Sequence, residues 1–305
     1  MDASAMVHPS LEDLVRLQFE TRQFSLLPRQ PVESLLSGRH ASRLRGRGLT
    51  FEELREYREG DDIRTIDWKA SARLRRTHVR VYSEERERPV LFVVDQRANM
   101  FFGSARTTKA TAAAEVTALG AWRTLQVGDR AGSIIFGDEE TIAIKPHRSQ
   151  TNVLRICHEL VRINRSLRAD TPPSRSEPLN EALRQAINLA PHDFLVVLVT
   201  DYHGNNDETR RLATSLAAHN DVIAVLTYDP LGIQLPSTPD LKAYDGESRV
   251  TLPHGKAFDQ SYQGAFQKRL ETLKDQLAGL RIPILPICTH DPVTEQVVSA
   301  LGHRR

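Results

Sequence analysis

Val90-Leu-Phe-Val-Val-Asp95 and Phe194-Leu-Val-Val-Leu-Val-Thr-Asp201 are the two stretches that decide the fold of this chain. Each is a continuous apolar run that ends in an acid, which is typical of a strand buried on both faces of a parallel sheet. From Val90 onward, strand-like and helix-like periodicities alternate along the sequence. Such alternation indicates helices on both sides of a mostly parallel sheet, and right-handed crossovers make that sheet doubly wound.

The remainder of the chain supplies the other elements of this alternation. Strands are expected at residues 131–136, 140–145, 222–228 and 282–288. Helices are expected at residues 107–127, 151–164, 179–190, 207–219, 257–280 and 292–301. An added hairpin is expected at residues 241–252, around the turn residues Asp245 and Gly246. The predicted fold class is therefore α/β, with a doubly wound, mostly parallel sheet of the Rossmann type over residues 89–305.

Composition excludes several classes of protein. The chain has 305 residues, of which 40% are hydrophobic and 26% charged, as expected of a globular protein. The formal net charge of +2 names no partner. Two cysteines exclude a disulfide framework and a cysteine-based zinc site, and favour a reducing compartment. The polar start does not resemble a signal peptide, and the longest apolar runs are strand-sized, so we expect a cytoplasmic protein without membrane insertion.

Residues 1–88 precede the first buried strand and are expected to form a mostly irregular and helical extension. A short helix is predicted at residues 10–23. The capping-box spacing of Thr50-Phe-Glu-Glu53 predicts helical turns that end near Gly60. Between them lies the basic segment Arg39–Arg47, which holds four arginines and no acid.

An ordered series of glycines, aromatic residues, arginines and acids overlaps the end of this basic segment. It comprises Gly46, Gly48, Phe51, Arg55, Tyr57, Gly60, Asp61, Asp62, Arg64, Asp67, Trp68 and Arg73. Alternating arginines and acids indicate ion pairs that hold an irregular segment in place. Its apolar anchors would be Tyr57, Ile63, Ile66 and Trp68. A second interpretation leaves Arg39–Arg47 and Arg73–Arg76 free as a surface for a partner.

The series resembles the signature of a bacterial family known as domain of unknown function 58, or DUF58. In that family the signature directly precedes a von Willebrand factor A-type domain, as it precedes the predicted α/β domain here. The resemblance implies a non-enzymatic adaptor. Such an adaptor would act with an AAA+ ATPase of the MoxR type in the assembly or remodelling of a client protein complex.

The candidate site lies where strands end, because ligands of open α/β sheets gather beyond the carboxyl ends of the strands. The sequence Asp95-Gln-Arg97-Ala-Asn99 resembles the Asp-x-Ser-x-Ser opening of the metal-ion-dependent adhesion site of von Willebrand factor A-type domains. Asp201 matches the second aspartate of that family, and Glu177 stands at the position of its threonine. Arg97 replaces the first serine, which in the family ligates the metal.

This replacement changes the expected chemistry. Magnesium requires oxygen ligands, whereas an arginine offers five donors, no acceptor and a permanent positive charge. We therefore expect a cluster in which Arg97 pairs with Asp95, Asp201 or Glu177 and takes the place of the metal. No cofactor is expected. If a divalent cation were retained, its ligands would be Asp95, Asn99 and Asp201.

The sequence shows no assembled catalytic constellation. It has neither a P-loop, nor a dinucleotide fingerprint, nor a Gly-x-Ser-x-Gly elbow, so we expect no enzyme. One alternative is nucleic-acid binding by the basic segments Arg39–Arg47 and Arg73–Arg80. The acids from Glu52 to Asp67 and the scarcity of stacking aromatics argue against it. A hydrolase built on Asp95, Asp201 and His203 is the remaining alternative.

Overall fold

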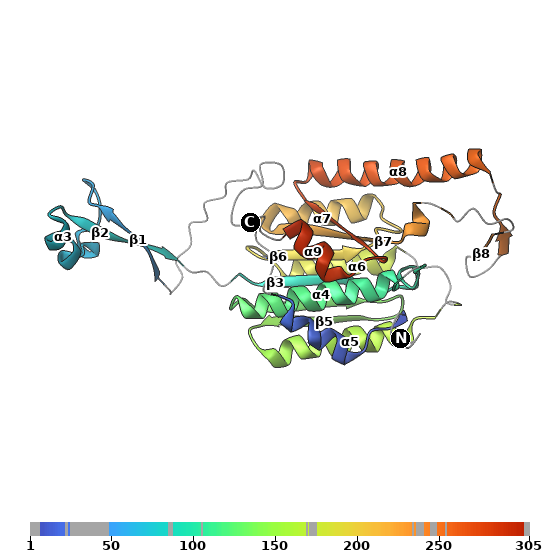
Figure 1. Ribbon diagram of the computed structural model, residues 1–305, viewed down its shortest axis with the longest axis horizontal. Coiled ribbons are helices and arrows are strands. Elements are labelled where there is room, and N and C mark those ends of the chain that lie inside the picture. Colours follow the sequence, from blue (N-terminus) through green and yellow to red (C-terminus); the bar gives the residue numbers. More distant parts are fainter. Residues whose placement is uncertain are drawn as a thin grey trace. The chain divides into compact units, whose positions relative to one another are not determined.

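The computed structural model describes residues 7–21, 24, 49–84, 88–104, 106–168, 170, 176–233, 235, 241–244, 249–253 and 255–301. The chain forms two compact units (Figure 1). The main unit consists of residues 1–37 and 88–305, and the small unit of residues 38–87. Among the helices of the described ranges, none is long and apolar enough to cross a membrane.

The main unit is built on a six-stranded, mostly parallel sheet. Its strands are β3 (Val90–Asp95), β4 (Ala131–Phe136), β5 (Thr141–His147), β6 (Leu195–Thr200), β7 (Asp221–Tyr228) and β10 (Ile284–Cys288). Their order is β10-β7-β6-β3-β4-β5, and only the edge strand β5 runs antiparallel to its neighbour. Strands β4 and β5 follow β3 on one side of it, and β6, β7 and β10 then follow on the other side. The predicted doubly wound α/β class is confirmed, and its strand order reverses between β3 and β6.

Helices cover both faces of this sheet. One face carries α2 (Leu11–Arg16), α4 (Lys109–Gln126), α5 (Gln150–Ser166) and α9 (Val293–Leu301). The other carries α6 (Glu177–Leu189), α7 (Asp207–His219) and α8 (Lys256–Gly279). Side chains of β3 alternate between the two hydrophobic cores: Phe92 packs into the first and Val93 into the second. This two-sided burial explains why β3 is apolar throughout.

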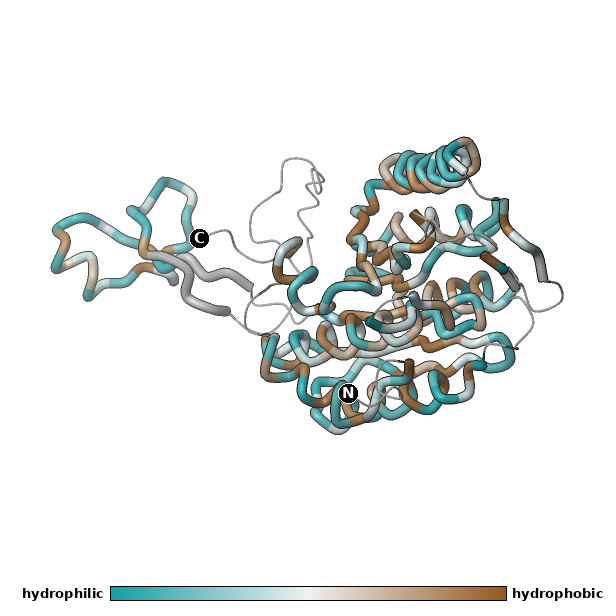
Figure 2. Tube along the Cα trace, turned by 45° about the vertical axis from the view of Figure 1, so that its right-hand side comes forward, coloured by the Kyte–Doolittle hydropathy of each residue, from teal (hydrophilic) through white to brown (hydrophobic). Residues whose placement is uncertain are grey.

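Helix α8 differs from the other covering helices. Of its 24 residues, only Leu273 and Leu277 are buried. Figure 2, in which α8 is seen nearly end-on, shows both hydrophilic and hydrophobic residues around it. The helix therefore rests on the sheet through few side chains and leaves space beneath it.

The N-terminal segment belongs to the main unit, which corrects the expected boundary between residues 88 and 89. Helix α2 continues into η1 (Leu17–Phe19), and its Leu14 is fully buried in the core beside α4 and α5. The indole nitrogen of Trp122 donates a hydrogen bond to the carbonyl of Leu14 at 3.0 Å. Because α2 buries its apolar face on the α/β domain, only residues 38–87 form a separate unit.

The small unit is a two-stranded antiparallel sheet rather than an irregular and helical extension. It comprises β1 (Leu49–Glu56), η3 (Ile63–Thr65), α3 (Trp68–Leu74) and β2 (His78–Glu84). The helical turns predicted from residue 50 are wrong, because β1 pairs with β2 along its whole length. Capping-box spacing is a local signal, and pairing with a strand more than twenty residues away overrides it.

Short elements complete the loops of the main unit. These are η4 (Ala98–Met100), η5 (Pro230–Gly232), β8 (Lys242–Tyr244) and β9 (Arg249–Thr251). Strands β8 and β9 pair antiparallel and form the expected hairpin. Its turn residues Asp245 and Gly246 lie outside the described part of the chain.

Close contact between α4 and β3 predicts an unusual response to substitution. A Cβ atom on Gly120 would lie 2.7 Å from Cε1 of the fully buried Phe92. We expect Gly120→Ala to lower the free energy of unfolding by about 1–3 kcal/mol, because the core is already filled. The matched control is Gly264→Ala in α8, where no atom beyond the two neighbouring residues and the backbone of the helix itself lies within 4 Å of the new methyl group. The free energy of unfolding of the control should rise by roughly 0.5–1 kcal/mol, because alanine has a higher helix propensity than glycine. Urea denaturation measures both, and a gain in both variants would contradict the close contact.

Candidate functional site at the carboxyl edge of the sheet

The candidate site lies at the point where the strand order reverses. Asp95 is the last residue of β3, and Asp201 directly follows β6, the neighbouring parallel strand. Parallel strands end at the same edge of a sheet, so the two carboxylates lie in the crevice where open α/β sheets bind ligands. The loops that follow them carry the remaining residues of the site.

Asp95 and Arg97 form a completely buried ion pair. Both side chains are 0% exposed. The guanidinium is bidentate, with Nε 3.0 Å from Oδ1 and Nη2 2.7 Å from Oδ2 of Asp95. The backbone N–H of Arg97 also donates to Oδ1, and the hydroxyl of Thr200 donates to Oδ2 at 2.6 Å. A carboxylate has about four acceptor positions, and these four donors use them all.

The surroundings of Arg97 keep it charged. Burial alone would lower its pKa, but attraction to Asp95, with smaller contributions from Asp201 and Asp138, raises the pKa of Arg97 above its ordinary value. Its Nη2 also donates to the backbone carbonyl of His203 at 3.2 Å. The guanidinium carbon lies 5.5 Å from the ring centroid of Phe136, within the range of a cation–π contact. Arg97 thus links the loop after β3 to the loop after β6.

Asp201 is neutralised by a different cation. Lys109, the first residue of α4, places its Nζ 2.5 Å from Oδ2 of Asp201. The side-chain amide of Asn99 and the backbone N–H of His203 donate to Oδ1, each at 2.8 Å. Burial raises the pKa of Asp201, but attraction to Lys109 together with the hydrogen bonds from His203 and Asn99 holds the pKa below its ordinary value. Asp201 is therefore ionised, paired and held from three sides.

The structure brings together four of the five predicted positions: Asp95, Arg97, Asn99 and Asp201. Glu177 is not among them. It begins α6 with an exposed side chain, and no hydrogen bond or ion pair among the described residues joins it to the cluster. A Cβ on Gly204, in the loop after β6, would lie 3.6 Å from Cα of Ser176, so this loop runs directly beside the start of α6.

Two further members of the cluster, Lys109 and Thr200, were not predicted. Lys109 stands in the first turn of α4, where the helix dipole disfavours a positive charge. A lysine at such a position, directly after the capping residue Thr108, is the signal that could have indicated a nearby acid. Thr200 offered no such signal, because a threonine at the end of a buried strand is common.

A further buried carboxylate fastens the neighbouring loops. Asp229 follows β7 and accepts hydrogen bonds from the backbone N–H and hydroxyl of Ser104, at 2.8 and 2.5 Å. It also accepts from the hydroxyl of Thr289 at 2.5 Å. Burial raises the pKa of Asp229, but the hydrogen bonds from Ser104 and Thr289 outweigh it and hold the pKa below its ordinary value. In the same way, Asp138 after β4 accepts from the backbone N–H of Ala98 at 2.6 Å.

These donors do not fit a divalent cation. Magnesium would need open oxygen ligands in a near-octahedral shell. The acceptor positions of Asp95 are occupied, and Lys109 holds Asp201, so a cation would have to displace two positive side chains of the protein itself. Within the described ranges, no group of three or more His, Cys, Asp or Glu side chains is arranged to hold a metal ion.

In the small unit, the acids of the predicted series hold turns and helix ends. Asp61 accepts from the Arg55 guanidinium at 2.8 Å, which lowers the pKa of Asp61. Asp67 caps α3 through the backbone N–H of Ala70 and also accepts from Arg80. These contacts support the interpretation of the series as internal ion pairs.

The predicted apolar anchors of the small unit are partly wrong. Ile63 begins η3 and Trp68 begins α3, and these two residues are 68% and 71% exposed. Arg73 is also exposed. Two members of the predicted series, Gly46 and Gly48, fall outside the described residues, and the side chain of a third, Phe51, is not described. The basic segment Arg39–Arg47 also lies outside the described residues.

Fold and site together define a doubly wound α/β domain protein in which cations of the chain itself pair the carboxylates at the strand ends. The family described as "Protein of unknown function DUF58" matches residues 53–273, and the chain belongs to this family. It is 27% identical to the uncharacterized proteins Mb1516 of Mycobacterium bovis and Rv1480 of Mycobacterium tuberculosis. Each alignment spans 321 positions, 99% of this chain and 96% of the relative.

Two solved structures from Bacteroides are similar at lower identity. The conserved hypothetical protein BatB of Bacteroides thetaiotaomicron is 13% identical, with a TM-score of 0.40 over 68% of this chain and 93% of BatB. An aerotolerance-related membrane protein of Bacteroides fragilis, crystallised with multiple mutations to serine, is 14% identical, with a TM-score of 0.41 over 70% and 96% of the two chains.

The buried pair predicts a large loss of stability when one partner is removed. Arg97→Ala leaves the Asp95 carboxylate buried and unpaired, and we expect it to lower the free energy of unfolding by about 3–5 kcal/mol. The matched control is Arg162→Ala, because Arg162 pairs with Glu140 on the surface, with both side chains 44% exposed. The free energy of unfolding of this control should fall by only about 0–1 kcal/mol.

A double variant separates charge from packing. Asp95→Asn combined with Arg97→Met removes both charges while keeping much of the volume. This double variant should lose less free energy of unfolding than Arg97→Ala alone. Urea denaturation at neutral pH measures all three variants. Equal losses in Arg97→Ala and Arg162→Ala would contradict the role assigned to the buried pair.

Proposed function

We propose that this protein is a non-enzymatic adaptor that binds protein partners through the loops at the carboxyl edge of its sheet, without a bridging cation. Membership of the DUF58 family supports a MoxR-type AAA+ ATPase as the partner, with a client protein complex as the target of remodelling. Because such a partner consumes ATP, the proposal places the adaptor in the cytoplasm. The family itself is of unknown function.

One observation carries the proposal: each carboxylate at the switch point is paired with a cation of the chain itself. Asp95 pairs with Arg97, and Asp201 pairs with Lys109. A cation shared between two proteins needs open oxygen ligands on both sides. Since these acceptors are engaged, a partner must be recognised by direct contacts with side chains and backbone of the surrounding loops.

The loops around the cluster suit such recognition. We define the recognition loops as residues 101–104, 138–140 and 203–207, which are largely exposed. Phe102 is 47% exposed, and Nζ of Lys109 lies 5.9 Å from its ring centroid. An exposed aromatic ring among polar and charged groups is typical of the residues that dominate binding energy at protein interfaces.

The alternatives receive less support from the described residues. His203 contacts the cluster through its backbone N–H and carbonyl, so these contacts provide no general base for a hydrolase. For nucleic-acid binding, two arginines of the second basic segment are already paired: Arg76 with Glu56 and Arg80 with Asp67. These pairs reduce the positive field that a phosphate backbone would meet.

The test is a binding measurement between the purified chain and the MoxR-type ATPase of the same organism. The ATPase is used free of nucleotide, so that a chelator cannot act through magnesium-bound ATP. We expect the dissociation constant to be unchanged by EDTA and to rise with salt, because direct ion pairs are screened. Loss of the complex in EDTA together with persistence at high salt would contradict the proposal.

A pair of variants locates the binding face. Phe102→Ala should weaken binding by about tenfold or more, as expected for a central aromatic contact. Phe19→Ala is the matched control, because Phe19 is also an exposed phenylalanine of the main unit but lies in η1, away from the recognition loops. Equal effects of the two substitutions would exclude the recognition loops as the binding face.

A further inference from the structure

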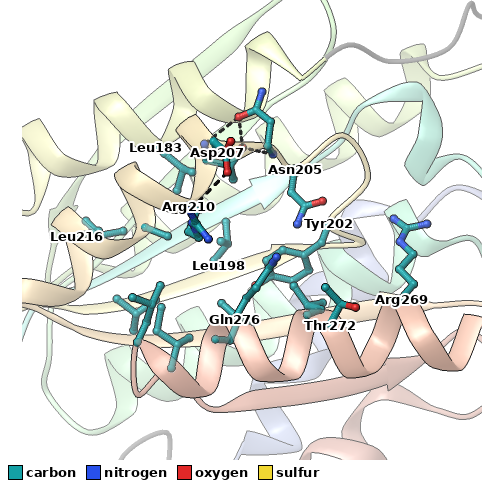
Figure 3. Close-up of a pocket in the computed structure, with 18 of the residues that line it drawn as sticks. Leu183, Leu198, Tyr202, Asn205, Asp207, Arg210, Leu216, Arg269, Thr272 and Gln276 are labelled. Carbon is teal, nitrogen blue, oxygen red and sulfur yellow. Dashed lines mark hydrogen bonds and ion pairs between the residues drawn. The ribbon is translucent and has the colours of Figure 1, made fainter.

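A cavity of about 720 Å³ lies between α7 and α8, against strands β6 and β7 (Figure 3). Its volume falls within the range of about 300–1,000 Å³ that is typical of small-molecule sites. It is separate from the Asp95–Asp201 cluster, which lines no part of it. The sparse packing of α8, through Leu273 and Leu277, is what leaves this space open.

The lining of the cavity is polar at one end and apolar at the other. The end near the carboxyl edge of the sheet is lined by Asn205, Asn206, Asp207, Arg210, Lys268 and Arg269. The opposite end is lined by Leu216, Val222, Leu277, Leu280 and Ile282. Along α7, the helix rise puts about 14 Å between Asp207 and Leu216. A ligand that fits this lining is therefore elongated, with a polar head and an apolar tail.

Tyr202 supplies a buried polar group without a partner. Its side chain lines the cavity (Figure 3) and is only 5% exposed. Among the described residues, its hydroxyl has no hydrogen-bond partner. Tyr202 also has a backbone φ of +56°, a region that residues other than glycine rarely adopt. Two unfavourable features at one residue indicate a functional constraint, and a hydrogen bond from a ligand would satisfy the hydroxyl.

The charges at the polar end favour an anionic head. Three cations, Arg210, Lys268 and Arg269, face one acid, Asp207, which lies 3.5 Å from Arg210. Among the described residues, no acidic side chain forms an ion pair with Lys268 or Arg269. Figure 3 shows Arg269 at the same end of the cavity as Asn205. These two cations are available to a carboxylate or phosphate group.

We propose that this cavity binds a single-chain anionic amphiphile. The anionic head contacts Lys268 and Arg269 and accepts a hydrogen bond from the hydroxyl of Tyr202. The apolar chain lies between α7 and α8 and reaches the leucines at the amino end of the sheet. The ligand fills the space beneath α8 and fixes this helix against the sheet.

The test uses three probes with the same chain and different heads: laurate, dodecanol and dodecyltrimethylammonium. Each is titrated into the full-length protein below its critical micelle concentration, and heat and fluorescence are recorded. We expect laurate to bind with a stoichiometry of one, at least about tenfold more tightly than dodecanol, and the cationic probe to bind most weakly. Hydrogen exchange across α8 should slow when laurate is bound.

Matched variants place the ligand in the cavity. Ala213→Phe puts a ring into the cavity from α7 and should weaken laurate binding at least tenfold, whereas Ala218→Phe, on the exposed side of the same helix, should change it less than twofold. Arg269→Glu should abolish the preference for the anionic head. Lys274→Glu makes the same kind of substitution at an exposed position of α8 outside the cavity, and should preserve that preference.

Tyr202→Phe separates a ligand-binding role from a structural one. It should weaken laurate binding by about tenfold or more, as expected for a hydrogen bond to a charged group. The unliganded variant should unfold at the same denaturant concentration as the wild type or a higher one, because it loses a buried hydroxyl that has no partner. Three results would each overturn the proposal: equal affinity for laurate and dodecanol, equal laurate affinity of the Ala213→Phe and Ala218→Phe variants, or no binding of laurate.

Discussion

The bidentate ion pair between Asp95 and Arg97 is the interaction on which the carboxyl edge of the sheet depends. A buried carboxylate is costly unless it is paired and hydrogen-bonded, and here four donors satisfy it. The same guanidinium reaches the backbone of His203, so one side chain joins the loops after β3 and β6. The geometry of the edge is therefore set by a charge of the protein itself.

The other acids of this edge act in the same way. Asp201 is held by Lys109 from the first turn of α4, and Asp229 joins Ser104 to Thr289. Each carboxylate therefore fastens one loop to another part of the domain. This arrangement keeps the recognition loops ordered while their outer side chains, including that of Phe102, stay exposed. Under the proposed function, a partner can bind this edge without a metal ion being acquired first.

The strongest sequence signals predicted the fold well. The buried strands β3 and β4 begin and end where their apolar patterns indicate, and Asp95 marked the edge of the sheet where the candidate site lies. Because an arginine cannot ligate a cation, the sequence predicted that Arg97 pairs with Asp95, Asp201 or Glu177, and in the structure its partner is Asp95. Contacts across the fold were harder to predict. Lys109 lies 92 positions from Asp201, and within the described ranges Glu177 forms no hydrogen bond or ion pair with the cluster. For β1, pairing with β2 overrode a local helical signal.

The most direct measurement of the central claim is a crystal structure of the protein soaked in manganese, with anomalous differences collected at the manganese edge. The account predicts no anomalous peak between Asp95 and Asp201, with the Arg97 guanidinium bidentate on Asp95 and the Lys109 ammonium on Asp201. A peak between these carboxylates, surrounded by oxygen ligands and with the Arg97 side chain turned away, would contradict it.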